Sequence, residues 1–292
     1  MILLTGATGN VGSSLLRRLT TDGARVRCLV RDPRRLGPER VRVQIALGDL
    51  SDPGSFRNAM RGVDTVVHLA AAIRDQPRGS IEELNGVATM RLVRAAERAG
   101  AKRFVFFSAI GAERHSSTRF FRAKALAEWA VAESPVASTI FAPSIVYSRG
   151  DPWVTLLERM TLLPTVPIAG GGGARYQPIW AEDVADCVMA ALAREPASGE
   201  RYELAGPEVL TYDDMARAVL HAHRRRRRLL HVPMPLVHAG LKGLGMVVGG
   251  AAFATWDEVS LMEVPMTSAR GTADAETLGV SPSSMRAVLE GP

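Results

Sequence analysis

Three glycines near the amino terminus have the spacing that nucleotide chemistry needs. Gly6, Gly9 and Gly12 lie in "TGATGNVG", directly between an apolar run and a helical pattern. Glycines in this context allow a tight turn and a close approach of the backbone to a pyrophosphate, which the free N–H groups of the following helix attract. The stretch therefore predicts a dinucleotide-binding loop.

The residues after the second apolar run bear on which dinucleotide is bound. An acidic side chain there takes ribose hydroxyls, whereas a basic one takes a 2′-phosphate. The sequence reads "VRDPRR", with Arg31, Arg34 and Arg35 around Asp32. Because the arginine fork suits a phosphate dianion, we predict that NADP(H) is the preferred cofactor. Asp32 leaves NAD(H) as the alternative.

Six short apolar runs alternate with helical patterns in the first half of the chain and must position this loop. They read "MILLTG", "ARVRCLVR", "VRVQIALGD", "DTVVHLAA", "KRFVFFSA" and "ASTIFAPS". Strand, helix, strand at this rhythm predicts an α/β fold with a doubly wound parallel sheet of the Rossmann type, covered by helices on both faces. We expect this nucleotide-binding core to occupy residues 1–145.

The rhythm loosens in residues 146–292, where we expect a small C-terminal α/β lobe over the carboxyl edge of the sheet, with some segments returning to the core. "AEDVADCVMAALARE" predicts an amphipathic helix that Glu182 or Asp183 caps. "RYELAG" predicts a short strand and "LTYDDMARAVLHAH" a further helix.

Composition indicates a soluble globular protein, since 292 residues with 47% hydrophobic and 23% charged side chains are neither disordered nor fibrous. Cys28 falls in a predicted strand and Cys187 in a predicted helix, which favours two buried, reduced thiols. An apolar strand from Ile2 leaves no room for a leader, so we expect a cytoplasmic protein. His221 and His223 have no nearby thiols, and we predict no metal site.

The positive charge is local, because five of the net +6 charges come from the run Arg224–Arg228. The run and the apolar residues after it have two interpretations. One is a solvated basic strand edge followed by a glycine-containing helix of the lobe. The other is attachment to an anionic membrane surface or to a protein complex. We expect no specific nucleic-acid binding, since aromatic residues are not interleaved with the arginines.

Several motifs together resemble a known family. The glycine loop, "GDLSD", "DTVVHLAA", "RFVFFSAIGA" and "YQPIWAEDVAD" are similar to those of atypical, extended-type short-chain dehydrogenases/reductases. The resemblance is strongest to the branch that includes the NADPH-binding accessory subunit of respiratory complex I and related bacterial proteins. It extends over nearly the whole chain.

The resemblance implies a set of cofactor-binding positions. The pyrophosphate would lie against Thr8, Gly9, Asn10 and Val11, the adenine near Asp49 and Leu50, and the nicotinamide-side ribose near Leu69, Ala70 and Ala71. The small alanines agree with this role, because they leave room for a flat ligand at the end of a strand. His68, by contrast, is better interpreted as a hydrogen-bonded core histidine than as an acid or base.

The resemblance also indicates a missing hydroxyl. In members that reduce carbonyls, a tyrosine donates the proton, a lysine four residues later binds the ribose, and a serine or threonine polarises the substrate. Here the tyrosine position is Phe120, Lys124 is retained, and Ser108 lies a residue or two earlier than the usual hydroxyl. Tyr147 and Tyr176 are candidate substitute acids, although packing roles suit them better.

We therefore predict an NADP(H)-binding protein with a broken Ser/Tyr/Lys triad. It would serve as a nucleotide-binding sensor or as a scaffold or assembly factor in a respiratory or quinone-related setting. The alternative is an NAD(P)H-dependent reductase of a quinone or other carbonyl compound that uses an unusual proton donor. Membrane-peripheral attachment is compatible with either.

Overall fold

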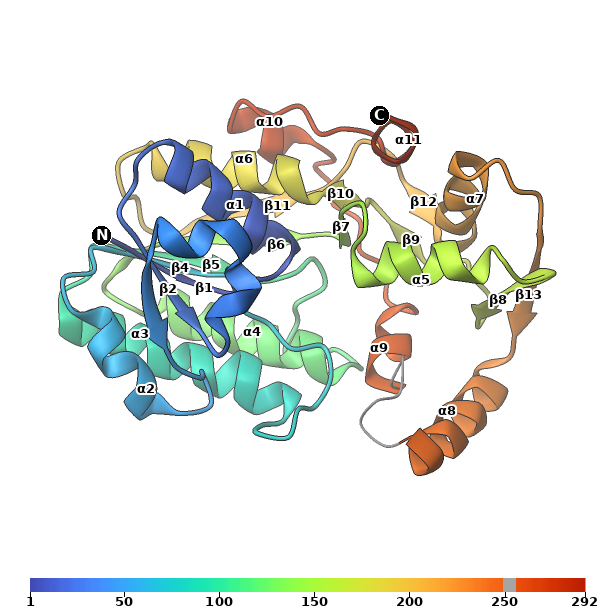
Figure 1. The fold of residues 1–292 in the computed structure, drawn as a ribbon, viewed down its shortest axis with the longest axis horizontal. Coiled ribbons are helices and arrows are strands. Elements are labelled where there is room, and N and C mark those ends of the chain that lie inside the picture. The colour runs from blue at the N-terminus through green and yellow to red at the C-terminus, as the bar shows by residue number, and fades with distance from the viewer. Residues whose placement is uncertain (249–255, 292) are drawn as a thin grey trace.

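A seven-stranded parallel sheet forms the centre of the protein in the computed structural model, which describes residues 1–248 and 256–291 (Figure 1). The strand order is β11-β6-β5-β4-β1-β2-β3. The strands are β1 (Ile2–Thr5), β2 (Val26–Val30), β3 (Gln44–Leu47), β4 (Thr65–His68), β5 (Arg103–Phe107), β6 (Ala137–Pro143) and β11 (Glu200–Leu204). The predicted doubly wound parallel sheet is confirmed, and so are its six sequence-predicted strands.

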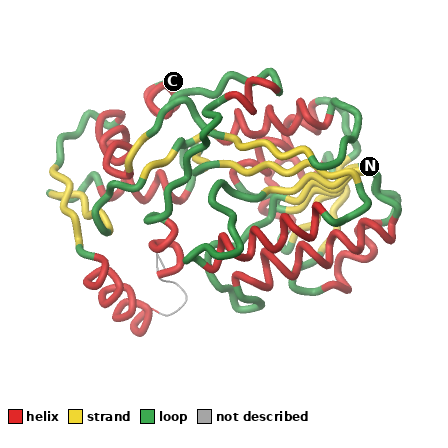
Figure 2. Tube along the Cα trace, turned by 180° about the vertical axis from the view of Figure 1, so that it is seen from behind, coloured by secondary structure: helices red, strands yellow, loops and turns green. Residues whose placement is uncertain are grey.

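Helices cover both faces of the sheet, as the view from behind shows (Figure 2). One face packs on α1 (Asn10–Thr21), α6 (Ala181–Leu192) and α10 (Ala273–Thr277). The other packs on α2 (Pro53–Arg57), α3 (Ala88–Ala99) and α4 (Arg119–Ala132). Shorter turns of helix are η1 (Pro33–Val41), η2 (Asn58–Met60) and η3 (Glu83–Val87). Cys28 and Cys187 are buried free thiols in the first of these layers, as predicted.

The predicted strand "RYELAG" is confirmed, and it joins the central sheet. Residues Glu200–Leu204 pair in parallel with Thr139–Pro143 of β6 and so extend the sheet by one strand. Helix α6, which precedes β11, packs closely on α1 through hydrogen bonds from Arg18 to Glu182 and Asp186. The predicted capping by Glu182 or Asp183 is wrong. The residue before α6 is Trp180, and both acidic side chains lie in the first turn, where they bind partners on other elements.

The second, smaller group of elements lies beyond the carboxyl edge of the sheet (Figure 1). Its helices are α5 (Pro152–Met160), α7 (Tyr212–Ala222), α8 (Met234–Val248), α9 (Trp256–Leu261) and α11 (Met285–Glu290). Its short strands pair two by two: β7 (Val146–Tyr147) with β10 (Ile179–Trp180), β8 (Thr165–Ala169) with β13 (Arg228–Val232), and β9 (Arg175–Tyr176) with β12 (Leu210–Thr211). The predicted helix at "LTYDDMARAVLHAH" is confirmed as α7, which Thr211 and Asp214 start with a capping box.

The arginine run links α7 to β13. Arg224 has a positive φ of 52° in the turn after the helix, and Arg228 begins the strand. Part of the apolar stretch that follows forms α8, while residues 249–255 lie outside the described residues. Within the described chain, no helix combines the length and the apolar character needed to cross a membrane.

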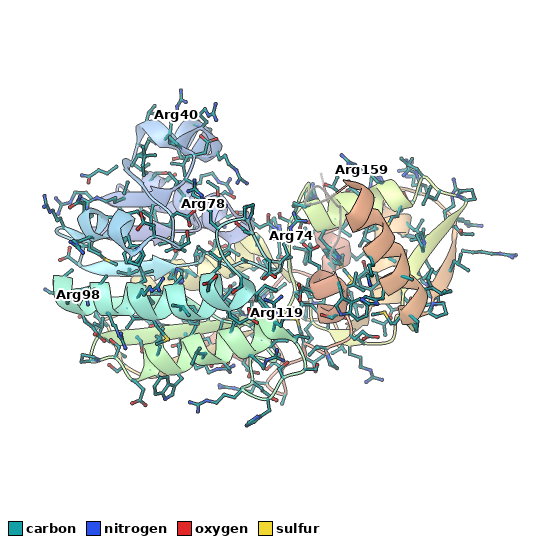
Figure 3. The ribbon with its side chains drawn as sticks, turned by 90° about the horizontal axis from the view of Figure 1, so that it is seen from below. Arg40, Arg74, Arg78, Arg98, Arg119 and Arg159 are labelled. Carbon is teal, nitrogen blue, oxygen red and sulfur yellow. The ribbon has the colours of Figure 1, made fainter. Side chains whose placement is uncertain are left out.

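Ion pairs connect α9 to the edge of the core. Arg119 at the start of α4 lies 3.5 Å from Asp257, and Arg74 lies 3.8 Å from Glu258. Arg119 also binds Asp75 and Glu82 on the core side, at 3.0 and 2.7 Å. Arg74 and Arg119 therefore lie where the two groups of elements meet (Figure 3).

Candidate functional site

The loop between β1 and α1 has the geometry that an anion requires. Gly6 has a φ of 76°, a region that favours glycine, and Gly9 precedes the first residue of α1. The helix has no side-chain cap and no acidic residue in its first turn. The first N–H groups of any helix have no intrahelical partner, and here no capping side chain occupies them. They point out of the helix end, which is the arrangement that binds phosphates.

Glycine at position 12 is needed for packing. A Cβ added there would lie 2.0 Å from the carbonyl oxygen of Gly6, closer than any real contact. A Cβ on Gly6 would likewise lie 2.6 Å from the amide nitrogen of Ala70, on the loop after β4. The first helix, the glycine loop and the end of β4 therefore approach one another through bare backbone.

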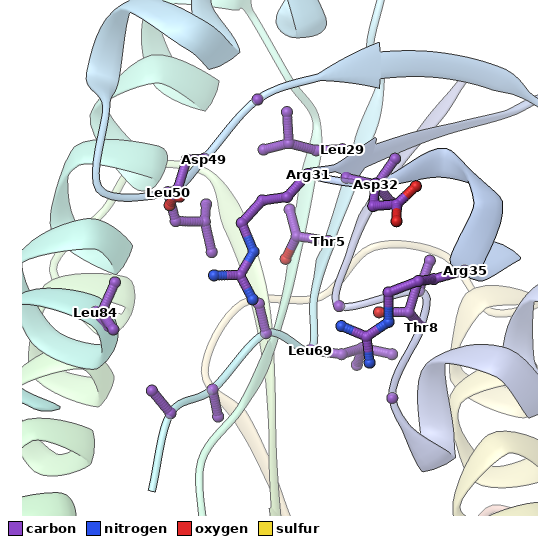
Figure 4. A pocket seen from close by; sticks show the side chains of 18 of the residues that line it. Thr5, Thr8, Leu29, Arg31, Asp32, Arg35, Asp49, Leu50, Leu69 and Leu84 are labelled. Atoms are coloured by element: carbon purple, nitrogen blue, oxygen red, sulfur yellow. The ribbon is translucent and has the colours of Figure 1, made fainter. Parts of the chain in front are cut away.

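A cavity of about 690 Å³ opens beside this loop, at the carboxyl ends of the first strands (Figure 4). Its volume lies within the range of ordinary ligand sites, about 300–1,000 Å³. Ten predicted cofactor positions line it: Gly6, Thr8, Gly9, Arg31, Arg35, Asp49, Leu50, Leu69, Ala70 and Ala71. Four others, Asn10, Val11, Gly12 and Lys124, are not among the lining residues. The first three of these begin α1. Lys124 lies on α4 and is buried against the carboxyl end of β5.

The arginines after β2 divide into two groups. Arg31 and Arg35 line the cavity, and Figure 4 shows both guanidinium groups directed into it. Arg34 instead forms a two-point ion pair with Asp32, at 3.0 Å for each contact. Hydrogen bonding from Arg34 also holds the pKa of Asp32 below its usual value. Asp32, the acidic group that would favour ribose hydroxyls, also lines the cavity but is engaged by an arginine, while two other arginines face the cavity.

Asp49 and Leu50 follow β3 and form the far wall. One oxygen of Asp49 accepts a hydrogen bond from the amide of Ser51 at 3.0 Å. The other, Oδ2, is buried in the cavity wall and has no hydrogen-bond partner among the described residues. Arg78 approaches this oxygen only to ion-pair distance, 3.7 Å, so the oxygen retains the capacity to accept a hydrogen bond from an N–H group of a ligand.

Sequence reasoning missed a hairpin that covers part of the opening. Gln76 lines the cavity and accepts a hydrogen bond from Arg31 Nη1 at 2.9 Å. The backbones of Gln76 and Gly79 pair with each other, and Arg78 lies 3.7 Å from Asp49 Oδ2. The turn residues of "QPRG" are a signal for this hairpin, but nothing in its local sequence points to Arg31 or Asp49.

Phe120 and Lys124 share one face of α4. The ammonium nitrogen of Lys124 lies 5.7 Å from the centre of the Phe120 ring and 5.0 Å from that of Phe106. It donates a hydrogen bond to the carbonyl oxygen of Phe107 at 2.6 Å. Lys124 is 2% exposed, and this burial lowers its pKa to about 7. The spacing of four residues places both side chains on the same side of the helix.

The other hydroxyl groups considered for catalysis are buried. Ser108 follows β5, and its Oγ has no hydrogen-bond partner among the described residues. The hydroxyl of Tyr147 also has no hydrogen-bond partner among the described residues, whereas that of Tyr176 donates to the carbonyl oxygen of Met262. Burial raises the pKa of both tyrosines. Their packing in the core of the lobe agrees with a structural role.

His68 has both ring nitrogens hydrogen-bonded. Nδ1 contacts Thr5 Oγ1 at 2.6 Å and Nε2 contacts Thr89 Oγ1 at 3.0 Å. Complete burial lowers its pKa to about 3, so the ring is neutral. The interpretation as a core histidine is confirmed. Among the described residues, no group of three or more histidine, cysteine or acidic side chains could hold a metal ion.

The residues present therefore fit a dinucleotide. A capless helix end and a glycine loop with no space for a Cβ match a pyrophosphate, and the adjoining cavity has room for the rest of a dinucleotide. The sequence profile of a family described as "NAD(P)H-binding" matches residues 6–195 of the chain. The chain belongs to this NAD(P)H-binding family.

Proteins that are similar to this chain differ in their roles. The chain is 30% identical over 247 residues to the Arabidopsis thaliana NADH dehydrogenase [ubiquinone] 1 alpha subcomplex subunit 9, mitochondrial; the match covers 80% of this chain and 60% of that protein. It is 28% identical to a ceramide reductase of Caulobacter vibrioides, with 94% and 83% covered. The branch suggested by the sequence motifs is thus confirmed, and reductases are also similar to this chain.

A solved structure agrees on the fold. The Thermus thermophilus UDP-glucose 4-epimerase in complex with NAD superposes with a TM-score of 0.76 at 19% identity, covering 99% of this chain and 96% of that one. At this level of identity the likeness concerns the fold alone.

Proposed function

We propose that this chain binds NADP(H) and has lost the ordinary proton donor for carbonyl reduction. The observation that carries the proposal is the side chain of Phe120. Its ring stands beside the Lys124 ammonium, where the family resemblance calls for a tyrosine. A phenyl ring has no proton to donate, and general-acid help in such reactions contributes roughly 10²- to 10⁴-fold. The nucleotide would then serve binding or sensing more than turnover.

The role that follows is a nucleotide-binding sensor, scaffold or assembly factor in a respiratory or quinone-related setting. The similarity to a subunit of a mitochondrial NADH dehydrogenase supports it. The bound cofactor would supply a hydride to an acceptor. This chain's own residues would hold its phosphates at the start of α1 and its adenosine between Arg31, Arg35 and Asp49.

Phe120→Tyr tests the proposal directly. The unmodified protein is expected to bind NADPH and to oxidise it very slowly with a panel of aldehydes, ketones and quinones. A phenol beside the Lys124 ammonium would be acidified, so the variant should raise any detectable rate by at least tenfold. Phe120→Leu is the matched control, since it removes the ring without adding a hydroxyl. Vigorous turnover by the unmodified protein that neither change affects would overturn the proposal.

Preference for NADP(H) over NAD(H) is the second part of the proposal. Arg31 and Arg35 both face the cavity, and Asp32 is engaged by Arg34. Arg31→Asp should reverse or flatten the preference in fluorescence titrations with NADPH and NADH. Arg40→Gln is the control, because this exposed arginine does not line the cavity and its loss should leave the preference unchanged. Equal or tighter binding of NADH by the unmodified protein would refute this assignment.

A true reductase is the second candidate function. Ser108 supports it, since its buried Oγ has no hydrogen-bond partner in the part of the chain that the structure describes and could polarise a carbonyl oxygen. The similarity to a ceramide reductase also favours this class. The substrate would be a quinone or another carbonyl compound, and the same NADPH oxidation panel decides between the candidates. Loss of turnover in Ser108→Ala with NADPH binding intact would favour the reductase.

A further inference from the structure

The far end of the small lobe brings together two segments that are distant in sequence. Strands β8 and β13 run parallel, with Arg228 opposite Thr165. The residues just before them, 161–164 and 224–227, therefore lie next to each other at the same end. Arg225 fixes the arrangement by a hydrogen bond to the hydroxyl of Thr161. In Figure 1 these strands lie at the end of the molecule opposite to the central sheet.

Two leucines project from this end. Leu162 is 64% exposed and Leu163 is 46% exposed. Their backbone is well held, because the amide of Leu162 donates to Arg159 O and that of Leu163 to Met160 O, at 3.1 and 3.0 Å. A structured turn thus keeps two adjacent apolar side chains in solvent. Two exposed leucines alone are ordinary on a protein surface, so their significance depends on the charge around them.

Positive charge surrounds the leucines. Arg159, Arg224 and Arg226–Arg228 are all exposed. Within the described part of the chain, none of these arginines is in an ion pair, and the nearby Glu158 is paired with His223 at 3.3 Å. Figure 3 shows Arg159 on the small lobe, far from Arg40 and Arg98 on the core. The five exposed arginines therefore outweigh the carboxylate of Glu158, and the charge of this end is positive.

We propose that this end of the small lobe docks on an anionic phospholipid surface. Leu162 and Leu163 would enter the boundary between headgroups and acyl chains, while Arg224 and Arg226–Arg228 contact the headgroup phosphates. Apolar insertion and electrostatic attraction add in such binding, and either one alone is weak. The inference is independent of turnover and of cofactor preference.

A lipid surface fits these residues better than other anionic partners. Two leucines bury far less than the roughly 1,200 Å² of a stable protein interface. The arginine run holds no aromatic residue on which a base could stack. Arginine and leucine side chains can instead reach a planar surface together, because they protrude from one end of the molecule.

Vesicle flotation tests the proposal with the full chain. Phosphatidylcholine vesicles containing one third phosphatidylglycerol should retain the protein at low salt, whereas pure phosphatidylcholine vesicles should not. Each arginine near an anionic surface contributes a factor of about five, so the combined change of Arg226, Arg227 and Arg228 to Gln should weaken binding roughly 100-fold. Changing Leu162 and Leu163 to Ser should weaken it about tenfold or more, because two apolar side chains no longer enter the lipid.

Matched changes at the other end of the molecule serve as controls. Changing Arg40, Arg94 and Arg98 to Gln removes three exposed charges from the core, and Val41→Ser with Leu47→Ser removes two exposed apolar side chains. Neither set should alter vesicle binding, and thermal melting by circular dichroism verifies that all variants fold. Absence of binding, or equal binding to neutral vesicles, would overturn the proposal. Binding that depends on the arginines but not on the leucines would also overturn it, because the protein would then adsorb by charge alone without apolar insertion.

Discussion

Replacing Lys124 by Met should change how stability depends on pH. Burial lowers the pKa of Lys124 from 10.5 to about 7 in the folded chain, against a smaller opposing effect of Glu128. Below pH 7 the lysine is protonated in both the folded and the unfolded chain, so the buried charge destabilises the folded state to its full extent. Between pH 7 and 10.5 the unfolded state binds more protons, so this group makes the fold more stable as pH rises.

The size of the effect follows from the pKa difference. A lowering from 10.5 to about 7 corresponds to roughly 5 kcal/mol between the two ends of the pH window. The side chain is 2% exposed, so solvent screening takes little from this figure. Methionine has a similar length and no charge. The Lys124→Met variant should therefore be the more stable protein at pH 6, and its advantage should shrink steadily up to pH 10.

Urea unfolding of both proteins from pH 6 to 10 measures this difference. The tyrosine and cysteine groups that also titrate at high pH are common to both chains and cancel in the comparison. Lys102→Met is the control, because this lysine is exposed at the start of β5 and its removal should leave the profile unchanged. Parallel curves for the unmodified protein and Lys124→Met would refute the buried-charge reasoning.

Two further changes probe the frame of the site. Gly12→Ala should lower NADPH affinity at least tenfold and reduce the free energy of unfolding by about 1–3 kcal/mol, since its Cβ would lie 2.0 Å from Gly6 O. Gly173→Ala is the control, because its Cβ would meet no described atom within 4 Å. Fluorescence titration measures the affinity and urea unfolding the stability. Arg119→Gln should remove a stabilisation that exists above pH 4.5 and disappears as pH falls toward 2, because hydrogen bonding to Arg119 lowers the pKa of Glu82 to about 2. Acid unfolding in which the variant and the unmodified protein differ equally at pH 2.5 and pH 7 would contradict it.

The sequence predicts the parts of the site that are built from neighbouring residues. The glycine loop is one strand, one turn and one helix in a row, so its residues and their spacing carry the geometry. The six strands of the first half are also recognisable, because their apolar runs are bounded by glycines and helical patterns. The shared face of Phe120 and Lys124 follows from their spacing of four on a helix.

Contacts between distant segments could not be read from the sequence. Gln76 meets Arg31 only because the loop after β4 folds over the end of β2. Glu182 lies in the first turn of α6, and its carboxylate is engaged by Ser14, Arg17 and Arg18 on α1, which are more than 160 residues away in the sequence. The partnership of Leu162 and Leu163 with the arginine run depends on the pairing of β8 with β13, which no local pattern encodes.

The hydrogen bonding of Lys124 bears on why a lysine occupies this buried position. An ammonium group has three donors, and the described structure gives this one a single hydrogen bond, to Phe107. Two aromatic rings contact the rest of the charge but cannot replace oxygen acceptors. A side chain needed only for packing would be uncharged here, because burial disfavours the ammonium form. We propose that the hydroxyl groups of a nucleotide would supply the missing acceptors, which requires the buried ammonium group to become accessible from the cavity that it does not line here.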